Sequence, residues 1–383
     1  MSEAFSLSEE QQLVLEAADR YARDRIAPLA RRMDDEEWWP DKEFRELGKN
    51  GYFGITVPPE LGGAGLDLWT SGLVLQAFSR WNPAFALSWV AHENLCLNNI
   101  YRNANETLRH KYLPSLCAGK SIGALGLTEP GAGSDALGAM STTARRNGDR
   151  YILNGRKMFI TNGPVADVLL VYAKTSPDKG PHGISAFIVE KDFSGFSVAQ
   201  KLTKMGFRGS QTGELLFDDC EVPAENLVGT EDEGVAVVMS GLDLERAVIS
   251  PICVGMAERA LEIAIEYAKT REQFGVVIGS FQALKHRAAK VFMEIELCRS
   301  SVMAAANAAD DGDADLTLLV SLAKARCSDA FILATNESVQ MYAGIGMTDE
   351  HDAGFYLKRA RVTEMTFGDT AWHRDRWARL RGY

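Results

Sequence analysis

Leu125-Gly126-Leu127-Thr128-Glu129-Pro130-Gly131-Ala132-Gly133-Ser134-Asp135 is the stretch of sequence that separates the possible folds. Its residues Gly131 to Ala136 fit the pattern G-x-G-x-x-A of a dinucleotide-binding turn, which needs a strand before it and a helix after it. A β-hairpin is predicted after this segment instead, so a doubly wound nucleotide-binding fold is rejected. No Gly-Lys-Ser or Gly-Lys-Thr follows, which excludes a P-loop. On local features alone, an ordinary glycine turn and a functional loop remain equally open.

The residues that follow have the character of a β domain. Residues 151–160 form two β-like runs around Asn154-Gly155, and Asn-Gly is the strongest short signal for a hairpin turn. Three further apolar runs predict strands at residues 168–172, 184–189 and 214–217. The sequence therefore predicts a middle β domain over residues 119–232.

Helical periodicity dominates on both sides of this domain. Near the N-terminus, Ser8 and Gln11 fit a capping box at the start of a helix. After Gly234, a seam with heptad-like spacing predicts antiparallel packing in a bundle and consists of Leu284, Ala288, Val291, Ile295, Cys298 and Val302. Because helices are segregated from strands, we expect an α+β protein with an N-terminal α-helical domain at residues 1–118 and a C-terminal α-helical bundle at residues 233–383.

Composition narrows the functional classes. The chain has 383 residues, of which 46% are hydrophobic and 24% charged, and its net charge is −11. That charge argues against a nucleic-acid binder, whose affinity depends on neutralising phosphates. No apolar run is long enough to cross a bilayer and the N-terminus lacks signal-peptide features, so we expect a cytoplasmic protein. The six scattered cysteines and six histidines show no metal-ligand spacing, so no metal is expected.

Several longer motifs resemble those of the acyl-CoA dehydrogenase family. Residues 128–135 (Thr-Glu-Pro-Gly-Ala-Gly-Ser-Asp) resemble its first signature, and residues 159–163 (Phe-Ile-Thr-Asn-Gly) resemble its second flavin segment. Residues 206–212 (Gly-Phe-Arg-Gly-Ser-Gln-Thr) and 271–275 (Arg-Glu-Gln-Phe-Gly) also fit. The resemblance covers nearly the whole chain and favours a functional loop at the glycine-rich segment.

The resemblance implies an N-terminal α domain, a middle β-barrel and a C-terminal four-helix bundle. It also implies FAD as cofactor, an acyl-CoA as substrate, an electron-transfer flavoprotein as electron acceptor and a homotetramer as the assembly. The residues that it assigns to the flavin are Leu125, Leu127, Thr128, Gly133, Ser134, Phe159, Ile160, Thr161, Thr370 and Trp372. A partner chain would bind the nucleotide part of FAD through Arg271, Phe274, Gln282, Gln340 and Gly344.

The reaction of this family needs one carboxylate aimed at the substrate. The Cα–H of a thioester is a weak acid, so a carboxylate has to take its proton, while the hydride from Cβ goes to the flavin because no side chain accepts it. Most members carry this base in a Tyr-Glu-Gly-Thr segment, but the matching residues here are Phe-Gly-Asp-Thr at 367–370. Residues 241–246 (Gly-Leu-Asp-Leu-Glu-Arg) resemble the base-bearing helix of isovaleryl-CoA dehydrogenases, so we predict Glu245 as the base.

Other roles remain open in the same region. Glu245 could instead be a surface glutamate paired along its helix, with Asp369 and Glu364 as lesser candidates for the base. Pro251 is expected to kink the helix or to end it nearby. The substrate is expected to contact Ser134, Asp243, Arg246 and Gly368, of which Gly368 would hold the thioester oxygen through its N–H and Asp243 and Arg246 could equally form an ion pair.

Within the family, the sequence is similar to the branch of isovaleryl-CoA and citronellyl-CoA dehydrogenases, which act on branched acyl chains. Residues 87–96 also resemble this branch. Two other functional classes stay open. One is an acyl-CoA oxidase-like flavoenzyme that reacts with oxygen. The other is a non-catalytic member that binds flavin or nucleic acid, against which the acidic charge and Glu245 argue.

Overall fold

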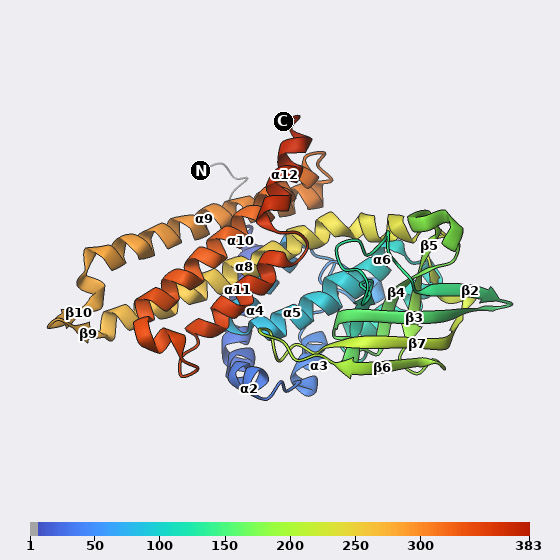
Figure 1. Cartoon of the computed structure of the whole chain (residues 1–383), viewed down its shortest axis with the longest axis horizontal. Helices are drawn as coiled ribbons and strands as arrows, with labels where there is room; N and C mark the ends of the chain where they lie inside the picture. The colour runs from blue at the N-terminus through green and yellow to red at the C-terminus, as the bar shows by residue number, and fades with distance from the viewer. Residues whose placement is uncertain (1–6) are drawn as a thin grey trace.

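Two helical regions and a large β-sheet are arranged along the long axis of the molecule (Figure 1). The computed structural model describes residues 7–383. The capping box predicted at Ser8 and Gln11 is confirmed at the start of the first helix. The helices of the N-terminal region are α1 (Glu9–Tyr21), α2 (Ala30–Asp35), α3 (Asp41–Lys49), α4 (Leu68–Trp81), α5 (Pro83–Val90), α6 (Asn99–Asn103) and α7 (Glu106–Cys117).

A π-helical segment, η5 (Ala91–Asn98), joins α5 to α6 without a break. Its turns are wider than those of an α-helix, so it changes the direction in which the following side chains point. Such segments are frequent at functional sites. This one leads directly into Asn99, whose side chain reaches α8 (Gly234–Thr270).

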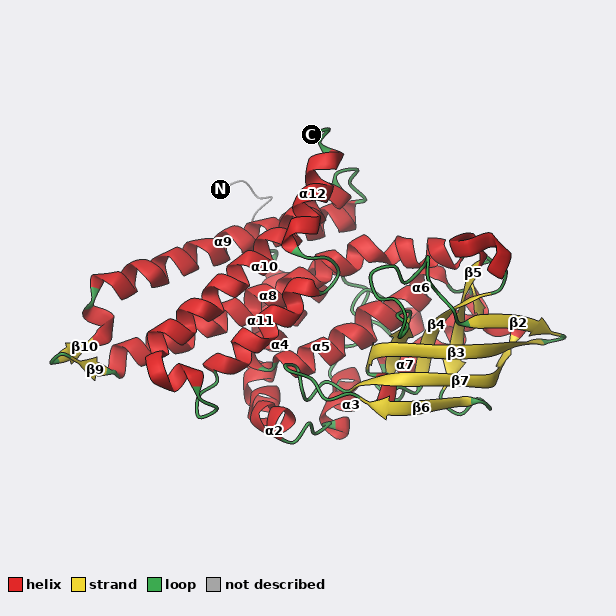
Figure 2. Cartoon of the chain, in the orientation of Figure 1, coloured by secondary structure: helices red, strands yellow, loops and turns green. Residues whose placement is uncertain are grey.

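Strands β1 to β8 gather at one end of the molecule, and a short two-stranded hairpin, β9 (Glu272–Gln273) and β10 (Val276–Val277), lies at the opposite tip (Figure 2). Strands β1 to β8 form one sheet in the order β6-β7-β3-β2-β4-β5-β8, with β1 paired in parallel to β4. The strands predicted near residues 168, 184 and 214 are confirmed as β4, β5 and β7. The strands of this sheet are β1 (Gly123–Gly126), β2 (Thr143–Asn147), β3 (Arg150–Thr161), β4 (Val168–Lys174), β5 (Ile184–Glu190), β6 (Phe196–Lys201), β7 (Thr212–Pro223) and β8 (Leu227–Val228).

The hairpin predicted at Asn154-Gly155 is wrong. Strand β3 runs straight through these residues, because β7 pairs with it on both sides of Gly155 across an irregularity in the register. A Cβ atom at Gly155 would lie 2.5 Å from Thr142 Oγ1, so glycine permits a close approach there rather than a turn. The hairpin lies at the preceding Asn147-Gly148, where β2 turns into β3 and Gly148 has a φ of +64°.

The C-terminal region contains four long packed helices. They are α8 (Gly234–Thr270), α9 (Gln282–Asp311), α10 (Leu316–Tyr342) and α11 (Ala353–Met365), followed by the shorter α12 (Thr370–Leu380). Of the predicted seam on α9, four members are buried and Leu284 and Ala288 are half-buried against the same core. Of the two effects expected of Pro251, an end of the helix is wrong, since α8 continues to Thr270, and a kink stays a prediction. The predicted domain limits at residues 118 and 232 stay predictions.

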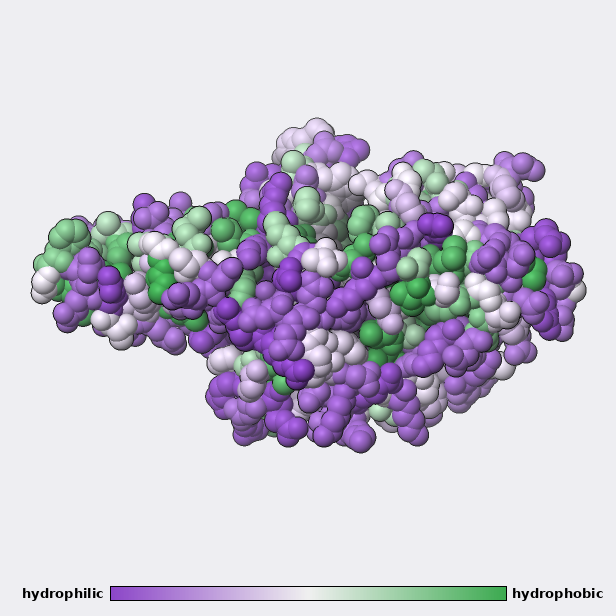
Figure 3. All heavy atoms as spheres, turned by 60° about the horizontal axis from the view of Figure 1, so that its bottom comes forward, coloured by the Kyte–Doolittle hydropathy of each residue, from purple (hydrophilic) through white to green (hydrophobic). Residues whose placement is uncertain are grey.

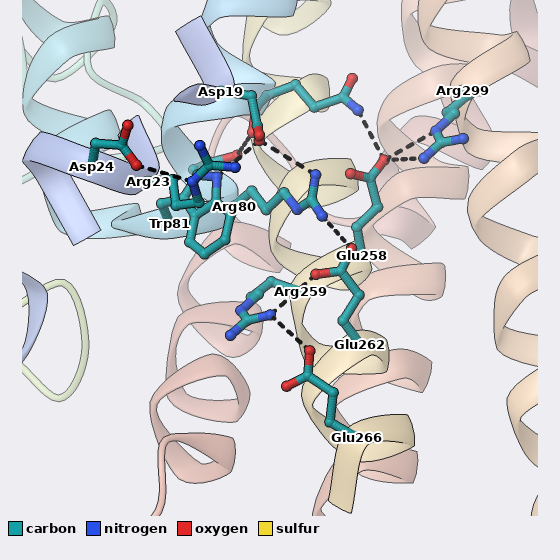
Figure 4. Close-up of polar contacts among 12 residues, drawn as sticks. Asp19, Arg23, Asp24, Arg80, Trp81, Glu258, Arg259, Glu262, Glu266 and Arg299 are labelled. Carbon is teal, nitrogen blue, oxygen red and sulfur yellow. Dashed lines mark hydrogen bonds and ion pairs between the residues drawn. The ribbon is translucent and has the colours of Figure 1, made fainter. Parts of the chain in front are cut away.

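The two helical regions share one apolar core. Phe78 and Trp89 of the N-terminal region belong to the same buried cluster as Ile252 of α8 and Phe331 of α10. A polar network lies at one edge of this core, where Arg80 of α4 donates to carboxylates of α1 and α8 (Figure 4). Partly exposed ion pairs contribute about 0–1 kcal/mol each, so burial of apolar surface dominates this packing.

Candidate active site

A cavity of about 270 Å³ lies where the sheet meets the helices. The sheet side is lined by Leu125, Leu127, Thr128, Phe159, Ile160, Thr161 and Tyr172. The helical side is lined by Leu87, Val90, Ala91, Asn94, Leu95, Val238, Leu242, Glu245 and Ile249, and one edge by Thr366 and Phe367. Most of these side chains are apolar, so the cavity suits an apolar group beside one carboxylate.

Glu245 contributes that carboxylate. Its side chain lies on α8 and only 8% of the residue is exposed. Burial raises the pKa of Glu245 to about 7, although the Asn99 amide and the Arg102 guanidinium act in the opposite direction. A carboxyl group with a pKa near neutral is suited to take a proton from carbon, because it is a stronger base than an exposed carboxylate.

Asn99 and Arg102 hold this carboxylate in place. Asn99 Nδ2 donates to Glu245 Oε1 at 2.7 Å and to the Leu95 carbonyl at 2.9 Å. Arg102 Nη2 donates to Asn99 Oδ1 at 3.3 Å, which fixes the orientation of the amide. Sequence reasoning missed both residues. The available signal was a run of polar residues inside an otherwise apolar helical segment, as buried polar groups need partners.

Two more polar side chains line the cavity and were also missed. Asn94 and Tyr172 are buried, and neither Asn94 Oδ1 nor Tyr172 Oη has a hydrogen-bond partner among residues 7–383. Tyr172 lies on β4, close enough to Glu245 for the carboxylate to contribute to the raised pKa of the phenol, after burial. The wall around Glu245 is therefore more polar than the remainder of the cavity.

The two predicted flavin segments come together on the sheet side. The Met158 N–H donates to the Thr128 carbonyl at 2.8 Å, which joins the end of β3 to the segment after β1. Below them, Lys157 Nζ donates to Glu129 Oε1 at 2.8 Å in a fully buried ion pair. Phe159 has a φ of +61° and is 64% exposed. Neither the left-handed backbone nor the exposed ring stabilises the fold. An exposed ring beside a cavity fits a planar ligand such as a flavin.

Gly133 and Ser134 lie outside the cavity lining. Both are exposed in the turn that follows Glu129, and a Cβ atom at Gly133 would lie 3.9 Å from Thr128 Cγ2. They are thus neighbours of the flavin segment without facing the cavity. The structure brings Leu125, Leu127, Thr128, Phe159, Ile160 and Thr161 together with Glu245 around one cavity, whose lining does not include Gly133 or Ser134. Flavin contact by these residues stays a prediction.

Gly368 lies in the turn between α11 and α12 and does not line the cavity either. Its φ is +104°, and a Cβ atom there would lie 2.7 Å from Trp372 Cε3. Trp372 thus occupies the space that a side chain at position 368 would need. Asp369 caps α12 by accepting the Trp372 N–H at 2.8 Å, so its carboxylate has a structural partner. Glu364 pairs with Arg361.

Asp243 and Arg246 form an ion pair, which was one of the two roles expected of them, the other being contact with the substrate. Arg246 Nη1 lies 2.9 Å from Asp243 Oδ1, and Arg376 Nη2 lies 3.0 Å from the same carboxylate oxygen. Both guanidinium groups also lie over the Trp372 ring, at 4.8 Å and 5.4 Å from its centre. Thr370 donates its hydroxyl to Asp329 at 3.0 Å. This cluster adjoins the cavity edge through Phe367, whose carbonyl accepts from Arg246.

The five residues predicted to bind the nucleotide lie at the opposite end of the molecule. Arg271 and Phe274 belong to the short hairpin of β9 (Glu272–Gln273) and β10 (Val276–Val277), at the tip farthest from the sheet (Figure 1). All five are exposed, and Phe274 is 93% exposed. Gln282 begins α9, while Gln340 and Gly344 lie at the end of α10 and just beyond it. The chain does not bring these residues to its own cavity.

A larger cavity, of about 590 Å³, lies between α1, α4, α8 and α9 beside the polar network, and no predicted site residue lines it. No group of three or more potential metal ligands occurs within residues 7–383. No helix in that part of the chain is long and apolar enough to span a membrane.

Comparison with known proteins identifies the family of this chain. Three family models match: the acyl-CoA dehydrogenase N-terminal domain at residues 8–120, the middle domain at 124–220 and the C-terminal domain at 232–380. The chain belongs to the acyl-CoA dehydrogenase family. It is therefore an oxidoreductase of the family's FAD-dependent type, acting on a CH–CH bond.

Similar acyl-CoA dehydrogenases and structures cover nearly the whole chain. Isovaleryl-CoA dehydrogenase, mitochondrial, from Pongo abelii is 42% identical over 94% of this chain and 86% of its own length. The structure of butyryl-CoA dehydrogenase from Megasphaera elsdenii has a TM-score of 0.95 at 35% identity, covering 99% of this chain and 100% of that one. A chain in a structure described as the electron transferring flavoprotein of Acidaminococcus fermentans has a TM-score of 0.95 at 39% identity, covering 98% of each chain.

Proposed function

We propose that this acyl-CoA dehydrogenase acts on a branched-chain acyl-CoA and that Glu245 removes the Cα proton. The observation that carries the proposal is the buried Glu245 carboxylate in the wall of the apolar cavity, opposite the two flavin segments. No other carboxylate lines this cavity within residues 7–383. The similarity to an isovaleryl-CoA dehydrogenase supports a branched substrate.

Each part of the site has a separate role in this proposal. The residues of the two flavin segments hold the ring of FAD, which supplies the hydride acceptor that side chains lack. The apolar helical wall receives the acyl chain and excludes water. Glu245 takes the Cα proton, and the backbone N–H of Gly368, which has no acceptor within residues 7–383, holds the thioester oxygen.

The lack of a side chain at Gly368 does not by itself favour a branched acyl chain. The space beside it is filled by Trp372, so the missing side chain does not enlarge the cavity. Support comes from the position of the base on α8 and from the similarity to an isovaleryl-CoA dehydrogenase.

The cofactor site is proposed to be completed by a second copy of the chain. Arg271, Phe274, Gln282, Gln340 and Gly344 are exposed at the tip opposite the cavity, so they can serve only a neighbour's FAD. Val276 and Val277 of β10 are exposed at the same tip, where Figure 3 shows hydrophobic surface. We further propose a tetramer, an electron-transfer flavoprotein as acceptor and a cytoplasmic location.

The test of the base is anaerobic reduction of bound FAD by a panel of isovaleryl-, citronellyl-, butyryl- and long-chain acyl-CoAs. Glu245→Gln keeps the size of the side chain and removes its basicity, so reduction should slow by at least about 10²–10⁴-fold while FAD and substrate still bind. The matched control is Glu258→Gln, because Glu258 lies on the same helix outside the cavity. Flavin bleaching at the wild-type rate in Glu245→Gln would contradict the assignment.

The same panel tests the substrate class. The proposal requires faster reduction by a branched acyl-CoA than by butyryl-CoA, and a clear preference for butyryl-CoA would contradict it. An oxygen-consumption assay separates a dehydrogenase from an oxidase-like enzyme, because only the latter passes electrons rapidly to oxygen.

A further inference from the structure

The turn between α11 and α12 is held in an unusual backbone conformation. Phe367 has a φ of +59° and Gly368 a φ of +104°. For a residue with a side chain, the left-handed region costs about 1–2 kcal/mol, so neighbouring groups must hold Phe367 there. Because Thr366 and Phe367 line the cavity edge, the conformation of this turn decides where its N–H groups point.

The first peptide of the turn is fixed through its carbonyl. Phe367 O lies 3.2 Å from Arg246 Nε and 3.2 Å from His373 Nε2. A carbonyl oxygen only accepts hydrogen bonds, so His373 carries its proton on Nε2. Burial lowers the pKa of His373 to about 4, which keeps the ring neutral near pH 7. In a trans peptide the N–H points opposite to the C=O, so these contacts turn the Gly368 N–H away from Arg246 and His373.

The next peptide is fixed by a buried lysine. Lys324 of α10 is 1% exposed, and its Nζ lies 3.1 Å from the Gly368 carbonyl oxygen. The same Nζ lies 2.9 Å from Ser328 Oγ and 3.1 Å from the Thr363 carbonyl oxygen, in the last turn of α11. These acceptors are uncharged, and the C-terminus of a helix favours a cation. One side chain thus ties the end of α11 and the turn to α10.

We propose that Lys324 and His373 are positioning residues, which hold the Phe367–Asp369 turn so that the Gly368 N–H faces the thioester oxygen of the substrate. The inference rests on the proposed function, since it presumes that a thioester is bound there. Neither side chain lines the cavity, and both act through backbone carbonyls.

The arrangement affects the acidity of the substrate in two ways. A donor on a peptide carbonyl polarises that peptide and strengthens its N–H as a donor, so the His373 contact strengthens the Gly368 N–H. Lys324 also places a positive charge directly behind the turn. Negative charge develops on the thioester oxygen as the Cα proton leaves, so both effects stabilise the deprotonated substrate.

The test uses a 3-thiaacyl-CoA, in which sulfur replaces the β-carbon. This analogue can lose its α-proton but has no β-hydrogen to transfer, and its enolate beside oxidised flavin gives a long-wavelength charge-transfer band. Titrating that band against pH reports the pKa of the bound α-proton. Lys324→Met and His373→Phe should each raise this pKa by about one unit, a tenfold change in the ionisation equilibrium.

Arg359→Met is the matched control, because Arg359 is a buried cation of α11 that pairs with Asp34 away from the turn. It should lower stability and leave the pKa of the analogue unchanged. If Lys324→Met does not fold, His373→Phe carries the test alone. An unchanged pKa in folded, flavin-containing variants overturns the inference. If even the wild-type protein gives no band, the proposed function fails first, and the inference with it.

Discussion

The side-chain amide of Asn99 donates to Glu245 Oε1 at 2.7 Å, across the interface between α6 and α8. The same amide receives a hydrogen bond from Arg102 at 3.3 Å, so the donor is held in one orientation. The proposed base is thus supported from a helix that lies far from it in the sequence, and the pKa of its carboxyl group depends on the residues of that helix.

Replacing Asn99 should shift the pH profile of the reaction. Asn99→Leu removes a donor that favours the ionised carboxylate, so the pKa of Glu245 should rise and flavin reduction should need a higher pH. The measurement is the anaerobic reduction rate as a function of pH. Asn98→Ala is the control, because Asn98 bonds to Thr56 and not to the base. An unchanged profile in Asn99→Leu would show that the hydrogen bond does not tune Glu245.

In the wild-type protein, the reduction rate should rise as the pH increases through about 7. Glu245 acts as a base only when ionised, and burial raises its pKa from the ordinary 4.5 to about 7, so the protonated form dominates below that value. Single-turnover reduction, measured from about pH 5.5 to about pH 9 with flavin content checked at each point, tests this. A rate that is flat across the range argues against Glu245 as the titrating group.

Arg271→Ala should lower FAD occupancy without disturbing the fold of the chain. The side chain is exposed at the tip of the bundle, and its proposed partner is the pyrophosphate of a neighbour's cofactor, a charge-assisted contact. Flavin content per chain and molecular mass in solution are the measurements. Arg146→Ala is the control, because Arg146 is an exposed arginine of β2 at the other end of the molecule. A monomer that retains full flavin contradicts the cross-subunit site.

Gly368→Ala should destabilise the protein by about 1–3 kcal/mol. The new Cβ atom would meet Trp372 at 2.7 Å, and the positive φ adds backbone strain. Gly354→Ala on α11 has open space around its Cβ position and serves as the control. Urea unfolding measures the difference. For the same reason, moving the carboxylate to position 368 is not expected to rescue Glu245→Gln, unless Trp372 is made smaller as well.

Motifs that resemble those of the family predicted the parts of the site that are continuous in the chain. The two flavin segments and the position of Glu245 on its helix are each contained in fewer than a dozen residues, and the structure brings them to one cavity. Strands β4, β5 and β7 were equally visible, because their apolar runs are bounded by turn residues.

Features that depend on distant partners could not be predicted. Asn147-Gly148 and Asn154-Gly155 carry the same local signal, and only the pairing of β3 with β7 decides which of them turns. The contact of Asn99 with Glu245 joins residues 146 positions apart. Likewise, the sequence shows that Gly368 lacks a side chain, but it does not show that Trp372 fills the space beside it.

The separation of the cavity from the β9–β10 tip has a genetic consequence. A chain damaged at Glu245 keeps an intact tip, and a chain damaged at Arg271 keeps an intact base. In a mixed assembly of the proposed kind, where the tip of one chain completes the cofactor site of its neighbour, one pairing combines both defects in a single site, while the reciprocal pairing contains neither. Two inactive alleles, one damaged at the cavity and one at the tip, would complement each other when expressed together. Two alleles that are both damaged at the cavity, or both at the tip, would not.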